Sequence, residues 1–233
     1  MSVAPLPIHL LAGGGWRALG GRDPLLAPIL AQAGKERPTI AYIGAASNDD
    51  RTFFLWLSRY FKKGGAGDVR LAALSSKRAD PDKARAIIAS ADLVFISGGD
   101  VEVGMQCLEA REIIPLLKKL YAGGKPFFGI SAGSIMLANG WVRWSDPDDD
   151  ATAETYPCLG LAPILCDTHA EKDDWEELQM LLKLSAPGHG YGIPSGGALR
   201  VDPDGGVAAL GKPVARFQRR KSDVVALAPL MPA

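Results

Sequence analysis

Short runs of apolar residues alternate with longer amphipathic stretches through the first half of the chain. The runs predicted as strands are residues 7–12, 39–43, 69–73, 91–96 and 126–130. The stretches predicted as helices are residues 23–33, a segment capped by Asp49 or Asp50 that runs to about Lys63, residues 80–90 and residues 103–121. Strands that are buried on both faces read as unbroken apolar runs, so this alternation predicts a parallel sheet with helices on both faces.

The second half of the chain has a less regular pattern. Residues 145–157 are acidic and polar, which predicts a loop, and residues 171–184 have apolar positions at helical spacing. After Pro187, short segments with turn signals at residues 202–206 predict antiparallel strands added to the edge of the sheet. Neither a repeat nor a linker divides the chain, so residues 1–233 are predicted as a single domain.

Charge and composition exclude several classes of partner. Among 233 residues, Lys and Arg number 26 and so do Asp and Glu, which makes the formal net charge zero. Proteins that bind nucleic acids or membrane surfaces need a basic excess on one face, so neither partner is expected. The chain contains no apolar run of ~18 residues, so no membrane span is predicted.

The three cysteines, Cys107, Cys158 and Cys166, form an odd set whose spacings fit neither a disulfide framework nor a metal site. A reducing compartment is the simplest interpretation, and the first residues read as a strand rather than a signal peptide. We therefore expect a cytoplasmic protein that uses no metal and no other cofactor.

Residues 129–133 fit the pattern G-x-S-x-G, with Ser131 at its centre. An apolar strand precedes this motif and a helix-compatible run follows it, which is the context that a nucleophile on a strained strand-to-helix turn requires. Such a turn aims the backbone N–H of Ala132 toward a developing oxyanion. The alternative interpretation is a plain turn of small residues.

A second loop, residues 97–100, follows the strand at 91–96 and contains Gly98 and Gly99. Ligands of doubly wound sheets bind at the carboxyl ends of the strands, so either glycine N–H could serve as a second oxyanion donor. Asp100 is expected to cap the following helix as well.

A serine nucleophile needs a base, and the chain has three histidines. His9 lies inside the first strand and His189 lies in a turn, whereas His169 follows an apolar segment at a predicted strand end. His169 is therefore the predicted base. The carboxylate that orients it is sought in the acidic segment 146–150, with Glu154 and Asp167 as less favoured choices.

Four segments together resemble peptidase family S51, the group of aspartyl dipeptidase and cyanophycinase. They are FISGGD at 95–100, GISAGS at 129–134, LGLAPILCDTH at 159–169 and YGIPSGGALRV at 191–201. The resemblance implies a class I glutamine amidotransferase-like fold, a three-layer αβα sandwich whose mostly parallel, doubly wound sheet carries antiparallel C-terminal edge strands.

The resemblance also implies a Ser-His-acid triad, with Ser131 as nucleophile and His169 as base. By position Asp146 is the acid, with Asp148 second. The loop at Gly98 and Gly99, together with Ala132, would form the oxyanion hole.

The resemblance implies that the substrate is a small peptide. It also implies that the enzyme acts as an exopeptidase or dipeptidase and cleaves at an aspartyl residue. Arg143 is the candidate cation for the aspartyl carboxylate, because Arg binds carboxylates bidentately, and Asp100 is a second candidate for substrate binding. A surface role for Arg143 is the alternative. A homodimer is the only assembly that we consider for this chain.

Two positions depart from the family pattern and put the substrate in doubt. The family often has an amide side chain after the glycine pair, where this chain has Asp100 and Val101. It also often has an acidic residue near 194–195, where this chain has Pro194 and Ser195. An esterase of the α/β-hydrolase type and a non-catalytic binding domain on the same scaffold are the competing hypotheses. A glutaminase is disfavoured because that chemistry uses Cys where this chain has Ser131.

Overall fold

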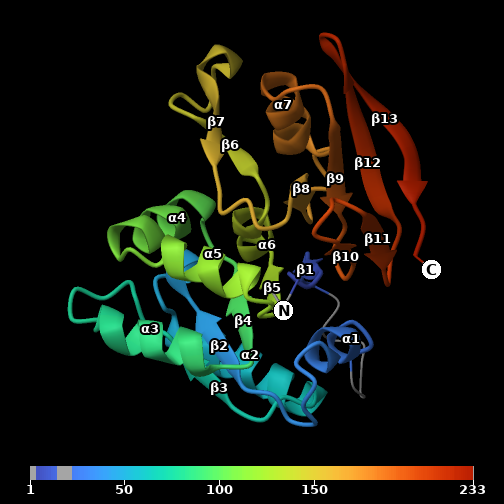
Figure 1. Ribbon diagram of the computed structural model, residues 1–233. Helices are drawn as coiled ribbons and strands as arrows, with labels where there is room; N and C mark the ends of the chain where they lie inside the picture. Colours follow the sequence, from blue (N-terminus) through green and yellow to red (C-terminus); the bar gives the residue numbers. More distant parts are fainter. Residues whose placement is uncertain (1–3, 15–22, 233) are drawn as a thin grey trace.

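A computed structural model describes residues 4–14 and 23–232, and its centre is a seven-stranded sheet of order β11-β10-β1-β5-β4-β2-β3 (Figure 1). The strands β1, β5, β4, β2 and β3 are parallel to one another, and β10 and β11 extend the β1 edge in antiparallel pairing. The bounds are β1 (Ile8–Leu11), β2 (Ile40–Ile43), β3 (Val69–Leu71), β4 (Leu93–Ile96), β5 (Phe127–Ile130), β10 (Ala198–Val201) and β11 (Val207–Leu210).

Alternate residues of the central strands bury into two separate cores. Val94 and Ile96 of β4 pack in one core, while Leu93 and Phe95 of the same strand pack in the other. The first core includes residues of α3 (Pro81–Ser90), α4 (Val101–Ala110), α5 (Ile114–Ala122) and α6 (Ala132–Leu137). The second includes residues of α1 (Leu26–Ala31) and α2 (Arg51–Gly64). This is the predicted three-layer αβα arrangement, with successive side chains on opposite faces of the sheet.

The helix predicted over 103–121 is wrong, since the segment forms two helices, α4 and α5. Glu112 adopts a left-handed φ of 53° between them, and Pro115 lies in the first turn of α5. Proline lacks the N–H of a helix interior and clashes with the preceding turn, so a continuous helix through residue 115 is disfavoured.

The predicted loop at 145–157 is only partly a loop. β6 (Gly140–Trp144) and β7 (Ala153–Pro157) form a two-stranded antiparallel hairpin, and a 3₁₀ turn (Asp150–Thr152) precedes β7. The acidic residues therefore occupy the hairpin loop and the start of its second strand.

A second, four-stranded sheet has the order β13-β12-β9-β8, with β8 parallel to β9. Its strands are β8 (Leu165–Thr168), β9 (His189–Ile193), β12 (Val214–Arg220) and β13 (Asp223–Leu230). Only β10 and β11 join the main sheet edge as predicted for the C-terminal strands. Figure 1 shows β12 and β13, in red, beside α7 (Glu176–Leu184) in the upper part of the molecule.

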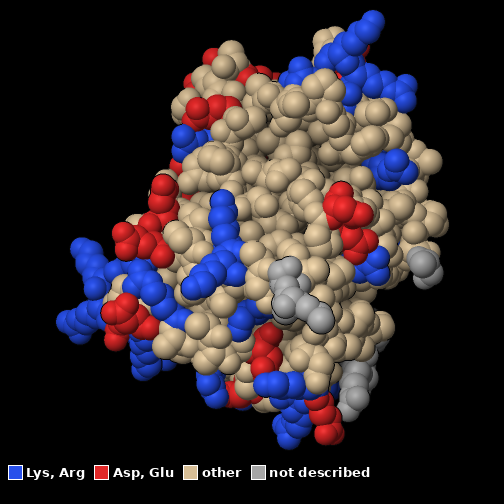
Figure 2. Space-filling view, in the orientation of Figure 1, with Lys and Arg blue, Asp and Glu red and all other residues tan. Residues whose placement is uncertain are grey.

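Figure 2 shows acidic and basic side chains interspersed over much of this face, with a basic group at the tip where β12 turns into β13. Arg219, Arg220 and Lys221 lie at this end of the strand. Across residues 4–14 and 23–232, no helix is long and apolar enough to cross a membrane.

Candidate active site

Ser131 lies on a sharp turn between β5 and α6, with φ 52° and ψ −128°. A non-glycine residue rarely adopts this conformation, so the surrounding packing must hold it. The two motif glycines make room for the turn: a Cβ on Gly129 would lie 2.5 Å from the carbonyl oxygen of Gly133, and one on Gly133 would lie 2.1 Å from that of Ile96. Side chains at either position would therefore push β5, α6 and β4 apart.

His169 follows β8, and its backbone N–H donates to Ile193 of β9 over 2.9 Å. Its Nε2 atom lies 2.7 Å from the hydroxyl oxygen of Ser131. Ser131 is partly buried and His169 is exposed, so a substrate can reach the pair from solvent. The structure thus brings together the two residues that the sequence singles out as nucleophile and base.

The glycine loop lies directly against Ser131. A Cβ on Gly98 would lie 3.0 Å from the Cβ of Ser131, and Gly99 has a φ of 143° that favours glycine. Within the described ranges, the N–H groups of Gly98 and Gly99 donate to no backbone carbonyl. Ala132 is the first residue of α6, where the N–H has no partner within its own helix.

Asp100 caps α4, since its carboxylate accepts from the backbone N–H of Val103 over 2.9 Å. It also lines the cavity beside Ser131. Both expectations for this residue, a cap and a position near the substrate, are compatible with this geometry.

Asp146 lies in the exposed loop between β6 and β7, where its carboxylate accepts from the backbone N–H of Asp148 over 3.1 Å. Among the hydrogen bonds of the described residues, none joins Asp146, Asp148 or Glu154 to His169. The structure therefore does not bring these carboxylates to the imidazole, and the assignment of Asp146 as the acid stays a prediction.

Glu171 is a carboxylate two residues after His169 in the chain, and it interacts with His169 electrostatically. Its Oε1 atom accepts a hydrogen bond from the backbone N–H of Ser195 over 3.0 Å. Ser195 follows Ile193, the last residue of β9, which pairs with Thr168 of β8. Burial raises the pKa of Glu171, but hydrogen bonds from its own backbone and from Ser195, together with the nearby His169, hold that pKa below its ordinary value. Sequence reasoning missed Glu171, although it lies only two residues after the predicted base.

A cavity of about 280 Å³ opens beside Ser131 and His169. Its lining includes carboxylates from several elements and a tryptophan from the β6–β7 hairpin: Asp100, Trp141, Asp167, Asp173 and Glu177. Trp141 donates its indole N–H to Glu177 over 2.7 Å. The acidic run that directly follows His169 in the sequence was a signal for part of this lining. The signal is weak, because the same residues read equally well as the exposed face of a helix.

Arg143 does not line this cavity. It lies on β6, where its guanidinium contacts Glu154 at 2.7 Å and Glu102 at 2.5 Å. It also stacks over the Tyr156 ring, 4.8 Å from the centroid. Its two carboxylate partners already neutralise it, which fits the surface role that was the alternative interpretation.

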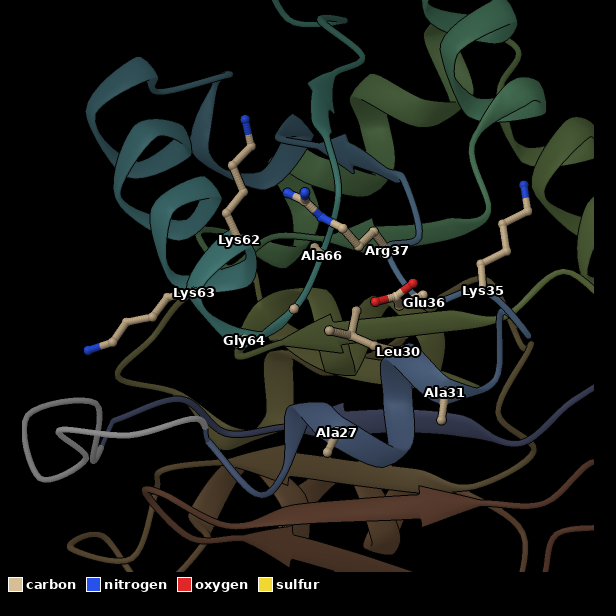
Figure 3. Close-up of a pocket in the computed structure, with 11 residues that line it drawn as sticks. Ala27, Leu30, Ala31, Lys35, Glu36, Arg37, Lys62, Lys63, Gly64 and Ala66 are labelled. Carbon is tan, nitrogen blue, oxygen red and sulfur yellow. The ribbon is translucent and has the colours of Figure 1, made fainter.

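A larger cavity of about 560 Å³ lies elsewhere, between α1 and the end of α2 (Figure 3). Its lysines point in different directions, and two of them pair with carboxylates, Lys35 with Asp92 and Lys62 with Asp68. It adjoins the segments that lead into β2 and β3, at the amino ends of these strands. Ligands of parallel sheets bind at the carboxyl ends, where Ser131 lies, so this cavity does not compete as the active site.

Within the described part of the chain, no group of three or more His, Cys, Asp or Glu side chains is arranged to hold a metal ion. The three cysteines are free thiols.

A serine paired with a histidine, on a strand-to-helix turn at the carboxyl edge of a parallel sheet, is typical of α/β hydrolytic enzymes. The sheet and its two helical layers form a class I glutamine amidotransferase-like fold. The chain belongs to peptidase family S51, which it matches over residues 8–208.

Relatives and solved structures agree with this assignment. The chain is 28% identical to Peptidase E of Pasteurella multocida over 150 residues, which are 58% of this chain and 60% of that protein. It is 41% identical to imidazole glycerol phosphate synthase subunit HisH of Acaryochloris marina over 54 residues, 23% of this chain and 25% of that protein. These matches thus span less than two thirds of either relative.

Two solved structures share the fold over nearly their whole length. A peptidase from an acI-B1 Actinobacterium superposes with a TM-score of 0.73 at 14% identity, covering 97% of this chain and 99% of that one. A putative Peptidase E from Listeria monocytogenes EGD-e superposes with a TM-score of 0.64 at 15% identity, covering 89% and 98%.

Proposed function

We propose that this protein is a serine peptidase that cleaves small peptides, as an exopeptidase or dipeptidase, with Ser131 as nucleophile. One observation carries the proposal: the Ser131 hydroxyl lies 2.7 Å from the His169 imidazole at the mouth of a cavity. Membership of peptidase family S51 and the similarity to Peptidase E support the peptidase assignment.

The proposed reaction has two halves. His169 Nε2 takes the hydroxyl proton as the Ser131 oxygen attacks the substrate carbonyl carbon, and the imidazolium then protonates the departing amine as the C–N bond breaks. A water molecule, deprotonated by His169, hydrolyses the acyl-enzyme and releases Ser131. The N–H groups of Gly98 or Gly99 and of Ala132 would donate to the oxyanion, because they lie beside Ser131 and have no backbone partner in the described structure.

Two carboxylates are candidates for the group that orients His169: the sequence favours Asp146, whereas the electrostatic interaction of Glu171 with His169 favours Glu171. Glu171 interacts electrostatically with His169 and is anchored on Ser195, where the family often has an acidic residue. We therefore propose Glu171 as the positioning residue for His169, ahead of Asp146.

Glu171→Gln should lower kcat roughly a hundredfold, because the neutral side chain no longer stabilises the imidazolium. Asp146→Asn is the matched control and should change kcat less than about threefold. The opposite order of effects, with Asp146→Asn the more damaging variant, would restore Asp146 as the acid.

Fluorophosphonate labelling tests the proposed function itself. A fluorophosphonate should modify the protein at Ser131 alone, as mapped by peptide mass spectrometry, and the labelled protein should lose its peptidase activity. Absence of labelling, or labelling at another serine, would contradict the proposal. Cleavage of simple esters without cleavage of any peptide would instead favour the esterase hypothesis.

The non-catalytic hypothesis expects that the presumed triad members do not meet in space. The contact between Ser131 and His169 argues against it. The expected preference for aspartyl substrates needs a cation at the cavity, and Arg143, the predicted one, is paired with Glu102 and Glu154 outside it. The charge of the cavity points to a different substrate.

A further inference from the structure

We propose that the cavity beside Ser131 binds a cationic group of the substrate, an ammonium or guanidinium, between Asp167, Asp173 and Glu177. These three residues are called the acidic rim below. The inference deepens the proposed peptidase function and rests on it, because it names the substrate class of the same site.

The charge of the cavity lining is of one sign. Asp100 and the acidic rim contribute carboxylates, and the lining includes neither Lys nor Arg. Asp100 and Asp173 each accept one backbone N–H, from Val103 and Trp175 respectively, and Glu177 accepts the indole N–H of Trp141. Neutral donors of this kind leave the negative charges uncompensated, so a bound cation would gain from all of them.

Asp167 supplies a second and independent observation. Only 6% of its surface is exposed, yet within the described structure its Oδ2 atom has no hydrogen-bond partner. Its other oxygen accepts the N–H of Thr168 over 2.6 Å, and the Thr168 hydroxyl is likewise buried without a partner. Buried polar atoms are nearly always hydrogen-bonded, so two orphaned groups in the lining of one cavity indicate a missing polar ligand.

The members of the acidic rim act on one another through space. Burial raises the pKa of Asp167 to about 7. The negative charges of Glu177 and Asp173 raise this pKa further, whereas the hydrogen bond from the Thr168 N–H lowers it. Burial also raises the pKa of Glu177, as does Asp173. A cation placed among these carboxylates would relieve their repulsion, whereas an aspartyl side chain would add to it.

An organic cation fits this lining better than a metal ion does. In the part of the chain that the structure describes, the carboxylates do not converge closely enough to form a metal site. A peptide cation is larger, spreads its hydrogen bonds over several acceptors and can rest against an aromatic wall such as Trp141, which also lines the cavity.

The cation can come from two parts of a peptide, the free amino terminus or the side chain of Lys or Arg. Amides of Lys, norleucine and Asp with a fluorogenic leaving group, each with a free and an acetylated amino terminus, separate these sources. If the side chain is bound, Lys should exceed norleucine at least tenfold in kcat/KM in both forms. If the terminus is bound, acetylation should lower kcat/KM about tenfold whatever the side chain.

Charge-removing variants connect the preference to the acidic rim. Glu177→Gln and Asp173→Asn should each reduce the preference for the cation about fivefold to tenfold. Asp174→Asn is the matched control, because it removes the same charge from the adjacent residue, which does not line the cavity. An equal effect of Asp174→Asn would show that only the overall charge matters and would overturn the inference.

Binding to Ser131→Ala gives a readout that does not depend on catalysis. By calorimetry, the ligands should bind this variant in the same order as in the kinetics. If the side chain is bound, lysinamide should bind more tightly than norleucinamide with or without N-acetylation; if the terminus is bound, both amides should bind more tightly than their N-acetylated forms. In either case N-acetyl aspartic acid α-amide, which keeps its side-chain carboxylate, should bind most weakly. A preference for Asp ligands, or no dependence on ligand charge, would overturn the inference while labelling at Ser131 still supports the proposed function. Failure of labelling and of all cleavage would overturn the proposed function itself.

Discussion

Ser131→Ala should lower kcat for peptide hydrolysis by roughly a thousandfold or more, because the nucleophile and its base act as a unit and little of the rate survives without the hydroxyl. The fold should persist. The side chain of Ser131 makes its hydrogen bond to the exposed His169, and alanine has the same Cβ at the strained φ of 52°. Steady-state kinetics and thermal unfolding of the two proteins measure both expectations.

Ser134→Ala is the control for this variant. Ser134 lies one turn further along α6, and its buried hydroxyl donates to Leu11 over 2.9 Å. Its removal should cost about 1 kcal/mol of stability while kcat stays within a few-fold of the wild-type value. Normal turnover by Ser131→Ala would refute the assignment of the nucleophile.

Gly133→Ala should destabilise the fold by about 3 kcal/mol or more, since the new methyl group would overlap the backbone of β4. The Cβ would lie 2.1 Å from the carbonyl oxygen of Ile96 and 2.7 Å from that of Ser97, neither of which is a flexible side-chain end. Relief requires α6 to move away from β4, and Ser131 at its start would move with it. Activity should therefore fall as well, because displacements of about 1 Å can cost a hundredfold in rate.

Urea unfolding measures this effect, with Gly188→Ala as the matched control. A Cβ on Gly188 would meet only the carbonyl oxygen of Ala186, at 3.7 Å. The free energy of unfolding of this variant should therefore stay within about 0.5 kcal/mol of the wild-type value. Equal midpoints for Gly133→Ala and the wild type would mean that the close approach of α6 to β4 does not limit stability.

Local patterns determined most of the secondary structure. Buried strands of the parallel sheet appear as short apolar runs, and Asp50 and Asp80 mark the starts of α2 and α3 as side-chain caps. Errors arose where a local backbone conformation interrupted a continuing pattern. Glu112 divides α4 from α5, and the left-handed Trp175 delays α7, predicted from residue 171, until Glu176. Apolar periodicity continues through such breaks, so it cannot reveal them.

The same division holds for the candidate site. Ser131 and His169 were predicted from their own surroundings, because each follows a strand and each chemistry needs a specific local context. Their contact at 2.7 Å depends on the packing of α6 against β8, which only the tertiary structure decided. The sequence likewise placed Asp146 and Arg143 near the site by their position in the chain, but the β6–β7 hairpin holds Arg143 against Glu102 and Glu154, away from the cavity.

The sequence by itself thus determined the α/β class, the family and the two residues proposed as nucleophile and base, because these depend on short segments whose chemistry is local. Tertiary structure alone decided the charge of the cavity beside Ser131. Asp100, Trp141, Asp167 and Glu177 come from separate elements, and each reads in the sequence as a cap, a strand residue or an exposed helix position. Electrostatic energy depends on distances through space, and no pattern along the chain encodes the distances that bring these groups to one cavity.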